Sequence, residues 1–200
     1  MARAGSASIP GSLPRNVTDG TLVECRLPGR TLGPEPASPV VASWPVEDGL
    51  FMRPFRSWRQ KRNYEGDYWS YRAPAHVGYE SLLERDSLIW LDFQPDTVSV
   101  AAQPLAFLWP LSGGKAGPRD HVVDYFVRRA DGSGLVVDVR ASGMRDGRFA
   151  AQSDLTRAAC ELIGWDYTVL DGLPEDSAVN AAGSLATART GAAPTRPPKR

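Results

Sequence analysis

In the middle of the chain, segments with helical spacing of apolar residues alternate with segments typical of β-strands. Helical spacing of apolar residues is present over 78–91 and again over 148–163, where Gly164 is placed to end the helix. Runs of β-branched and aromatic residues predict strands. These are residues 97–109, interrupted at Pro104, and residues 121–128, 135–140 and 165–170. The sequence therefore predicts an α/β core in the order helix, three strands, helix, strand.

The two ends of the chain lack this periodicity. Residues 1–49 are rich in proline and glycine, which predicts a mostly extended or disordered arm. Within it, one short strand is conceivable at 21–27 and a docking segment at 40–44. Residues 176–200 are rich in Ala, Gly, Thr and Pro and predict a disordered, weakly basic tail. The folded domain is expected over residues 50–175, with flexible extensions on both sides.

Composition narrows the class of protein. The chain carries 23 basic and 23 acidic residues, and this zero net charge excludes a histone-like protein with a cationic surface. No apolar run approaches the ~18 residues that a membrane-spanning helix needs. Arg3 is not followed by an apolar segment, so a signal peptide is not expected. Cys25 and Cys160 lie far apart and match no metal-binding spacing. A reduced, cytoplasmic protein without membrane contact is expected.

Carboxylates occupy conspicuous positions in the predicted core. Glu84 follows Glu80 by one helical turn, so both are expected on one helix face. Asp124 lies inside an apolar strand, and a turn at 131–134 would bring it close to Asp138 in the next strand. Because carboxylates in apolar strands are costly unless paired or bound to a cation, these acids are candidate ligands for Mg²⁺ or Mn²⁺.

A second interpretation needs no metal. Asp138 and Arg140 would then be a solvent-facing pair on a half-exposed strand, and Glu80 with Glu84 a hydrated helix surface. Spacing alone favours this interpretation for any single residue. Asp124 is the hardest to explain in this way, because its neighbours in the strand are all apolar.

Five blocks of sequence occur in an order that resembles a known nuclease family. They are Tyr79-Glu-Ser-Leu-Leu-Glu-Arg-Asp86, Leu91-Asp-Phe-Gln-Pro-Asp96, Gln103-Pro104, His121-Val-Val-Asp-Tyr-Phe126 and Val136-Val-Asp-Val-Arg140, with Arg62-Asn-Tyr-Glu-Gly66, Trp69 and Gly78 upstream. Over roughly residues 50–172 the chain resembles the TnsA-type endonuclease subunit of heteromeric transposases. The resemblance implies a restriction-endonuclease-like fold with a PD-(D/E)xK active site. It also implies Mg²⁺-dependent cleavage of DNA at transposon ends, beside a DDE-type transposase partner.

The resemblance assigns roles residue by residue. Glu84 matches the family's helix glutamate, Asp124 its strand aspartate and Asp138 its second acidic ligand, and the Val139 carbonyl is a further candidate metal ligand. Arg140 stands where the family has its catalytic lysine. An arginine stays protonated, so it can stabilise charge but cannot act as a base. Three outcomes therefore stay open: an active enzyme that uses Arg140 electrostatically, a slow enzyme, and a subunit kept for assembly.

The remaining polar residues receive simpler interpretations. Gln103 is another family feature, either a polar group that supports the site or, more plainly, a bend at a strand end. His121 is expected at a strand edge rather than on a metal, and His76 alone in a loop. Cys160 lies on the apolar side of its helix and is expected in the core.

Basic and aromatic residues alternate between residues 53 and 72. Guanidinium groups suit phosphates and aromatic rings can stack on bases, so this stretch predicts a DNA-binding surface. The alternative is that the arginines are solvated and the aromatic rings pack under the sheet. The candidate DNA contacts are Arg53, Arg56, Arg59, Lys61, Arg62, Arg72, Arg145 and Arg148, and the aromatic residues are Trp58, Tyr64, Tyr68, Trp69 and Tyr71.

Two functions from different classes follow. The first is a Mg²⁺-dependent endonuclease subunit of a bacterial, cytoplasmic transposase. The second is a catalytically impaired structural subunit, with arginine in place of lysine, that docks DNA and the partner transposase without cutting. A stand-alone nuclease for defence or repair is a third, weaker hypothesis. The sequence leaves the oligomeric state open, a homo-oligomer included.

Overall fold

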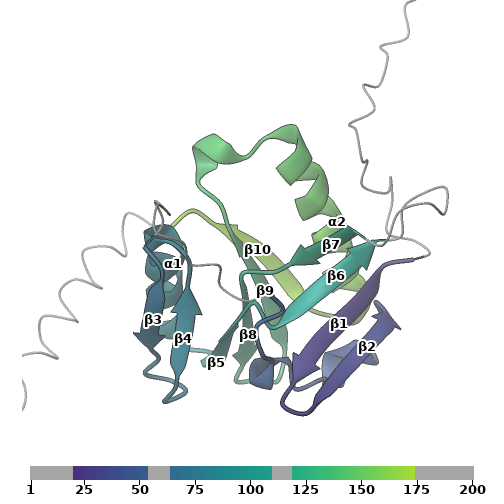
Figure 1. Ribbon diagram of the computed structural model, residues 1–200, viewed down its shortest axis with the longest axis horizontal. Coiled ribbons are helices and arrows are strands. Elements are labelled where there is room, and N and C mark those ends of the chain that lie inside the picture. Colours follow the sequence, from purple (N-terminus) through teal and green to yellow (C-terminus); the bar gives the residue numbers. More distant parts are fainter. Residues whose placement is uncertain (1–19, 54–63, 110–118, 174–200) are drawn as a thin grey trace, which may run out of the picture.

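The computed structural model describes residues 20–53, 64–109 and 119–173 (Figure 1). The tail expected over 176–200 lies outside these ranges, as does the beginning of the N-terminal arm. No helix in the described ranges is long and apolar enough to span a membrane.

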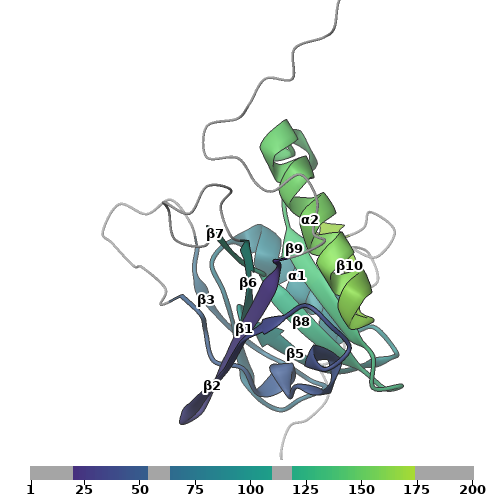
Figure 2. The same cartoon turned by 90° about the vertical axis from the view of Figure 1, so that its right-hand side faces the viewer.

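A four-stranded sheet forms the centre of the fold, and a helix covers each of its faces (Figure 1 and Figure 2). In spatial order its strands are β10 (Asp166–Leu170), β9 (Gly134–Val139), β8 (Tyr125–Arg129) and β5 (Thr97–Ala102). Strands β9 and β10 run parallel, and the other neighbours run antiparallel. The helices are α1 (Leu82–Asp92) and α2 (Gly147–Ile163). The predicted α/β class, both helices, the β8–β9 hairpin and the closing strand are confirmed.

Side chains alternate along these strands and divide the core into two layers. Tyr125 and Val137 pack with Leu88 of α1 on one face of the sheet. Phe126, the next residue along β8, packs with Ala159 of α2 on the other face. Each face of the sheet is therefore sealed by one helix, as the apolar stripes of the two helices require.

Local sequence signals explain where the helices begin and end. The side chains of Ser81 and Asp146 cap α1 and α2 by accepting hydrogen bonds from backbone amides of the first turn. Gly164 ends α2 in the left-handed conformation, with φ of 92°, and its amide donates to the carbonyl of Cys160. Glycine adopts this conformation without steric strain, so the predicted C-terminus is confirmed.

A second sheet uses the segment that was expected to be a mostly extended or disordered arm, and the short strand considered at 21–27 is confirmed within it. Its strands are β2 (Arg30–Pro36), β1 (Leu22–Leu27), β6 (Leu105–Trp109) and β7 (Arg119–Val122), in that spatial order. Two short 3₁₀ helices, Val41–Ser43 and Val46–Asp48, follow β2. Val23 and Cys25 of β1 are fully buried with Phe107 of β6. The described fold therefore begins near residue 22 rather than at residue 50, because β6 needs β1 as its partner.

The chain passes between the two sheets at two adjacent points. Sequence periodicity predicts one continuous strand over 121–128, but β7 ends at Val122 in one sheet and β8 starts at Tyr125 in the other. Similarly, β5 and β6 are separate strands on either side of Gln103 and belong to different sheets. Among the described residues, five strands rather than three thus lie between the helices. The amide of Gln103 donates to the carbonyl of Asp124 at 2.9 Å, so the two crossing points lie side by side.

A two-stranded hairpin, β3 (Gly66–Trp69) and β4 (His76–Tyr79), lies beside α1 and was not predicted (Figure 1). Buried Asp92, the last residue of α1, holds the chain between the two strands. Its carboxylate accepts hydrogen bonds from the hydroxyls of Tyr68 and Ser70, at 2.9 and 2.7 Å, and from the amides of Tyr71 and Arg72. The hairpin is thus fixed to α1 by one buried carboxylate.

Candidate functional site

Asp124 lies at the point where the chain passes from β7 to β8. Its carbonyl accepts the Gln103 amide, and its Oδ2 accepts the Val139 amide at 2.6 Å. Tyr125 pairs with Val137, and continuing this antiparallel register brings Asp124 opposite Asp138. The predicted juxtaposition of these two carboxylates in the β8–β9 hairpin therefore agrees with the strand pairing.

The carboxylates of Asp138 and Glu84 both affect the ionisation of Asp124. Burial raises the pKa of Asp124 well above its ordinary value, and the negative charge of Asp138 raises it further. The hydrogen bond from Val139 opposes this rise. Glu84 also raises the pKa of Asp124, whereas the Arg53 guanidinium lowers it. Asp124 is thus close enough to two other carboxylates to be destabilised as an anion, with Arg53 as a nearby cation.

Asp138 is almost completely buried, with 2% of its surface exposed. Its Oδ2 accepts hydrogen bonds from the Tyr167 hydroxyl at 2.7 Å and from Nε2 of His121 at 2.9 Å. Its Oδ1 is buried and has no hydrogen-bond partner among the described residues. Because a buried carboxylate oxygen without a partner is destabilising, this atom fits a bound cation.

His121 is itself fixed on three sides. Its Nδ1 lies 2.8 Å from Nε2 of Gln152, which can donate to it and thereby leave the ring proton on Nε2, facing Asp138. The ring stacks on Trp109, with 5.9 Å between centroids and 8° between planes. The sequence predicts only a strand-edge residue here. His121, Gln152 and Tyr167 come from three separate elements, and no local spacing signals that they meet at Asp138.

Glu84 has a structural role that the serine three residues before it explains. The Ser81 hydroxyl accepts the Glu84 amide, and the Glu84 carboxylate accepts the Glu80 amide at 2.7 Å. The Ser81 hydroxyl also lies 3.0 Å from the Glu84 carboxylate. This arrangement is a variant of the capping box at the start of α1, in which the glutamate accepts the amide of the residue before the N-cap. Glu80 precedes the helix, so the prediction that Glu80 and Glu84 share a helix face is wrong. Glu84 nevertheless lies close enough to raise the pKa values of Asp124 and Tyr125.

Arg140 directs its side chain toward the segment that follows β9. Its Nε donates to the carbonyl of Met144 at 3.1 Å, and its guanidinium carbon lies 5.6 Å from the centre of the Phe149 ring. The cation that lowers the pKa of Asp124 is Arg53, which the sequence predicts to be a DNA contact. Arg140, which the resemblance assigns to the catalytic lysine position, and the cation beside Asp124 are therefore different residues.

Gln103 supports the site through its backbone. It has a left-handed φ of 49°, which is strained for a residue with a side chain and costs on the order of 1–3 kcal/mol. Its carbonyl accepts the Met52 amide, so this crossing point is held on both sides. Its Oε1 is buried and has no hydrogen-bond partner in the described part of the chain. The bend predicted at this strand end is confirmed, whereas a role of the Gln103 side chain at the site stays a prediction.

The candidate DNA contacts divide into three groups. Arg56, Arg59, Lys61, Arg62 and the aromatic Trp58 lie outside the described residues. Arg72 donates to the carbonyls of Asp92 and Gln94 and thus closes the end of α1. Arg53, Arg145 and Arg148 are exposed. Among the aromatic residues, Tyr68 is tied to Asp92, whereas Tyr64, Trp69 and Tyr71 are exposed at 70%, 57% and 79%.

The other singled-out residues have structural roles. Cys160 is fully buried in the core, as predicted, and Cys25 is too. Burial raises the pKa of the Cys25 thiol to about 11, which makes it a poor nucleophile. His76 is the first residue of β4, not a loop residue, and meets Trp69 edge to face at 5.0 Å.

The three acids are not arranged as a ready-made metal site, so binding of a metal ion would require their side chains to move closer together. Within residues 20–53, 64–109 and 119–173, no group of three or more His, Cys, Asp or Glu side chains is arranged to hold one. Two observations nevertheless fit a hard divalent cation at Asp124 and Asp138. They are the unpartnered Oδ1 of Asp138 and the like-charge destabilisation of Asp124. Oxygen donors alone, as these are, suit Mg²⁺ or Mn²⁺.

Comparison with protein-family models gives no match, and no curated protein matches the sequence.

Proposed function

We propose that this chain is a DNA endonuclease subunit of a heteromeric transposase, with a Mg²⁺-dependent site at Asp124, Asp138 and Glu84. The observation that carries the proposal is the buried Oδ1 of Asp138, which has no hydrogen-bond partner among the described residues and belongs to a carboxylate that neighbours Asp124. Two neighbouring carboxylates, one of them buried, destabilise the fold as anions unless a cation joins them or one of them takes up a proton. Proteins accept such destabilisation at functional sites, so a catalytic explanation is favoured over a structural one.

In this proposal, different residues bind the metal ion, orient its ligands and stabilise charge on the substrate. Asp124, Asp138 and Glu84, with the Val139 carbonyl, would hold Mg²⁺ or Mn²⁺. When bound, such an ion lowers the pKa of a water nucleophile and neutralises charge on a phosphodiester. Tyr167 and His121 hold Oδ2 of Asp138 and so fix the direction of Oδ1. Arg53 supplies a positive charge beside Asp124, where a phosphate of DNA would approach.

The restriction-endonuclease-like fold is part of this proposal. It is supported by the order of the elements, in which α1 supplies Glu84, the start of β8 supplies Asp124 and β9 supplies Asp138. The mixed sheet between two helices is compatible with it. Cleavage at transposon ends and a DDE-type transposase partner rest on the family resemblance of the sequence blocks, and the exposed basic residues agree with a DNA substrate.

The test is cleavage of DNA that carries the transposon end, with Mg²⁺ and the partner transposase present. Asp124→Asn should abolish cutting by this subunit, because a neutral amide is a poor ligand for a hard cation. The matched control is Asp131→Asn at the exposed turn of the same hairpin, which should cut like the parent. Cutting by Asp124→Asn at the parental rate refutes the proposed site.

One observation favours the second candidate, a structural subunit that docks DNA and the transposase without cutting. The guanidinium of Arg140 is bound to the Met144 carbonyl and lies against Phe149 rather than being the cation beside Asp124. In this alternative the acids are a remnant of a nuclease site. A parent protein that stays silent with all partners present, but whose Arg140→Lys variant cuts, identifies this alternative.

A further inference from the structure

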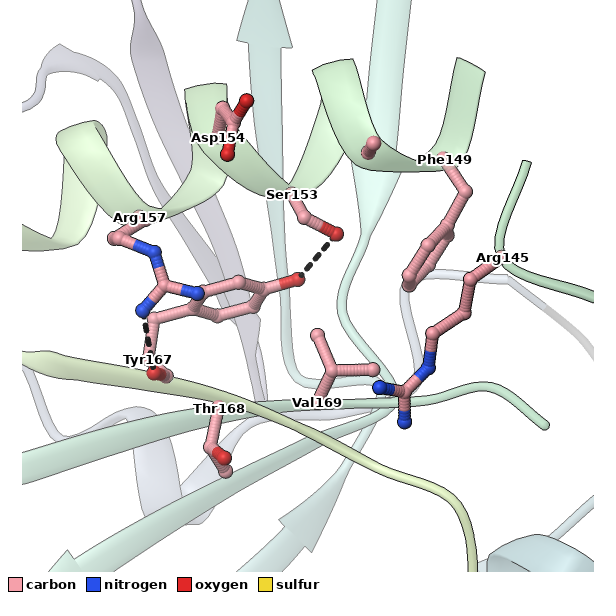
Figure 3. Close-up of a pocket in the computed structure, with 9 residues that line it drawn as sticks. Arg145, Phe149, Ser153, Asp154, Arg157, Tyr167, Thr168 and Val169 are labelled. Carbon is pink, nitrogen blue, oxygen red and sulfur yellow. Dashed lines mark hydrogen bonds between the residues drawn. The ribbon is translucent and has the colours of Figure 1, made fainter. Parts of the chain in front are cut away.

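A cavity of about 370 Å³ lies between α2 and β10, which is the edge strand of the central sheet (Figure 3). Its walls come from one side of α2, from β10 and from the segment before α2. The residues that matter for its chemistry are Arg145, Phe149, Asp154, Arg157, Tyr167 and Thr168. The volume falls at the lower end of the range for sites that hold small molecules or single groups of larger ones.

Two guanidinium groups flank this cavity, one toward each side in Figure 3. Arg157 lies 5.2 Å over the ring of Tyr167, and its Nη1 donates to the Tyr167 carbonyl at 3.3 Å. Arg145 is held through its Nε, which donates to the carbonyl of Arg140 at 3.1 Å. Each guanidinium has five N–H donors, so most remain for a ligand. Two preoriented guanidinium groups suit phosphate oxygens.

The acidic groups nearby oppose this charge only in part. Asp154 is the one carboxylate among the residues that line the cavity, and it is exposed on α2. Asp171 lies 4.0 Å from Arg145, at the limit of an ion pair, and is itself half exposed. An exposed pair of this length contributes little and is easily replaced by a stronger anion. The cavity therefore keeps a net positive character.

The cavity adjoins the candidate metal site through a single side chain. Tyr167 forms part of its wall. The Tyr167 hydroxyl donates its one proton to Oδ2 of Asp138 and lies 3.2 Å from the Ser153 hydroxyl, from which it can accept. The Arg140 carbonyl that holds Arg145 directly follows β9, the strand of Asp138. A nucleic-acid strand with one phosphate at the acids would thus have a neighbouring phosphate close to these arginines.

From this placement we infer that the cavity binds the phosphate of one nucleotide of the DNA strand that passes the candidate metal site, with Arg157 and Arg145 as its ligands. The inference rests on the proposed function, because a DNA substrate is part of that proposal. It adds Arg157 to the DNA contacts, a residue that lies far from the basic stretch at 53–72 in the sequence. The negative charge of Asp154 would repel the phosphate and thereby limit the affinity of this subsite for DNA.

The experiment measures binding of a fluorescein-labelled, mixed-sequence DNA duplex with a single-stranded overhang, over a range of salt concentrations. Ca²⁺ replaces Mg²⁺ so that binding is separated from cutting. Arg157→Gln should weaken binding several-fold and reduce the slope of log K against log[salt] by about one, as for one lost phosphate contact. Asp154→Asn should tighten binding, a gain that misfolding cannot produce. The control Arg30→Gln, exposed on the β1–β2 hairpin, should match the parent.

Three results overturn the inference in distinguishable ways. If Arg157→Gln and Asp154→Asn both bind like the parent while the parent cuts DNA, the subsite is refuted and the proposed function stands. If the parent neither binds nor cuts DNA, both fall. If free deoxynucleoside monophosphate binds in an Arg157-dependent manner but duplex binding does not depend on Arg157, the cavity is a nucleotide site and the assignment to DNA is wrong.

Discussion

Nε2 of His121 lies 2.9 Å from Oδ2 of Asp138, and the Tyr167 hydroxyl contacts the same oxygen at 2.7 Å. Both donors thus converge on one oxygen of a buried carboxylate and leave Oδ1 without a partner among the described residues. Histidine and tyrosine donors behind a carboxylate orient it toward a cation on its other side. This relationship makes His121 and Tyr167 positioning residues for the proposed metal site.

The first prediction concerns this pair. His121→Phe keeps the ring stacked on Trp109, and Tyr167→Phe removes only a hydroxyl, but each removes one donor from Asp138. Each variant should bind Mn²⁺ about 10–100-fold more weakly than the parent, as measured by calorimetry or by the electron paramagnetic resonance of free Mn²⁺. Ser153→Ala removes a hydroxyl that contacts Tyr167 rather than Asp138, so it should bind Mn²⁺ nearly as the parent does. Parental affinity in both donor variants refutes the positioning role.

The second prediction follows from the raised pKa of Asp124. A raised folded-state pKa means that the folded protein holds this proton more tightly than the unfolded chain does. Stability is therefore lost as the pH rises from the unfolded value of about 3.9 through the higher folded value. Asp124→Asn should raise the melting temperature at neutral pH, by roughly 2–4 °C per kcal/mol gained.

The advantage of Asp124→Asn should vanish below the unfolded pKa, where the aspartate is protonated in both states. The amide oxygen of asparagine can still accept the Val139 amide, so the local hydrogen bond is kept. Mn²⁺ should raise the melting temperature of the parent but not of the variant, since the ion binds only the carboxylate form. Thermal unfolding at several pH values, with and without Mn²⁺, measures both effects. An unchanged melting temperature at neutral pH contradicts the electrostatic account of Asp124.

Much of the central fold could be predicted from the sequence because its signals are local. The helix that ends at Gly164 follows from apolar spacing and one glycine, and the β8–β9 hairpin follows from two β-branched runs around the turn at Gly132. That hairpin alone predicts that Asp124 and Asp138 are neighbours. Glu84 was singled out by its spacing from Glu80 and by the family resemblance, and its hydrogen bond with Ser81 is a further local signal.

The unpredicted part depends on pairing between distant segments. A short strand at 21–27 is visible in the sequence, but its pairing with β6, about 80 residues later in the chain, and the sheet that this pairing builds are not. The division of 121–128 into two strands at Asp124 arises because β7 pairs with β6 while β8 pairs with β5. His121 meets Gln152 and Asp138 only after both pairings form. The periodicity of apolar residues within one segment does not predict contacts between residues of distant segments.

The third prediction tests the anchor of the β3–β4 hairpin. Asp92 is buried and accepts four hydrogen bonds, so Asp92→Ala leaves several donors, including the Ser70 hydroxyl, without a partner. The loss of stability should be about 3 kcal/mol, which corresponds to a decrease of roughly 6–12 °C in melting temperature. Asp96→Ala removes an exposed carboxylate that pairs with Arg129 at 3.4 Å and should cost less than about 1 kcal/mol.

The Asp92 variant should also bind DNA more weakly if the exposed residues beside it contact DNA. Tyr71 and Arg72 are positioned by their amides on the Asp92 carboxylate. Binding is compared below the melting temperature of the variant, so that a folded protein is measured. Equal stability of the Asp92 and Asp96 variants would show that the hairpin does not depend on this carboxylate.

The last prediction decides between a cutting and a non-cutting subunit. Arg140→Lys loses the hydrogen bond to the Met144 carbonyl and the contact with Phe149, which frees a compact ammonium group next to β9. Lysine can shed a proton and take part in activating water, a contribution typically worth about 10²–10⁴-fold. We therefore expect Arg140→Lys to cut end-sequence DNA faster than the parent. Arg30→Lys, exposed on the β1–β2 hairpin, makes the same exchange away from the acids and should leave the cleavage rate unchanged.

The comparison with the parent gives the result its meaning. A slow parent and a faster Arg140→Lys variant identify an endonuclease limited by its arginine. A silent parent and an active variant identify an assembly subunit that has lost catalysis at this position alone. An active parent whose rate does not change shows that position 140 is dispensable, and Arg53, the cation that lowers the pKa of Asp124, then becomes the residue to replace. Cleavage assays of the three proteins under identical conditions distinguish these cases.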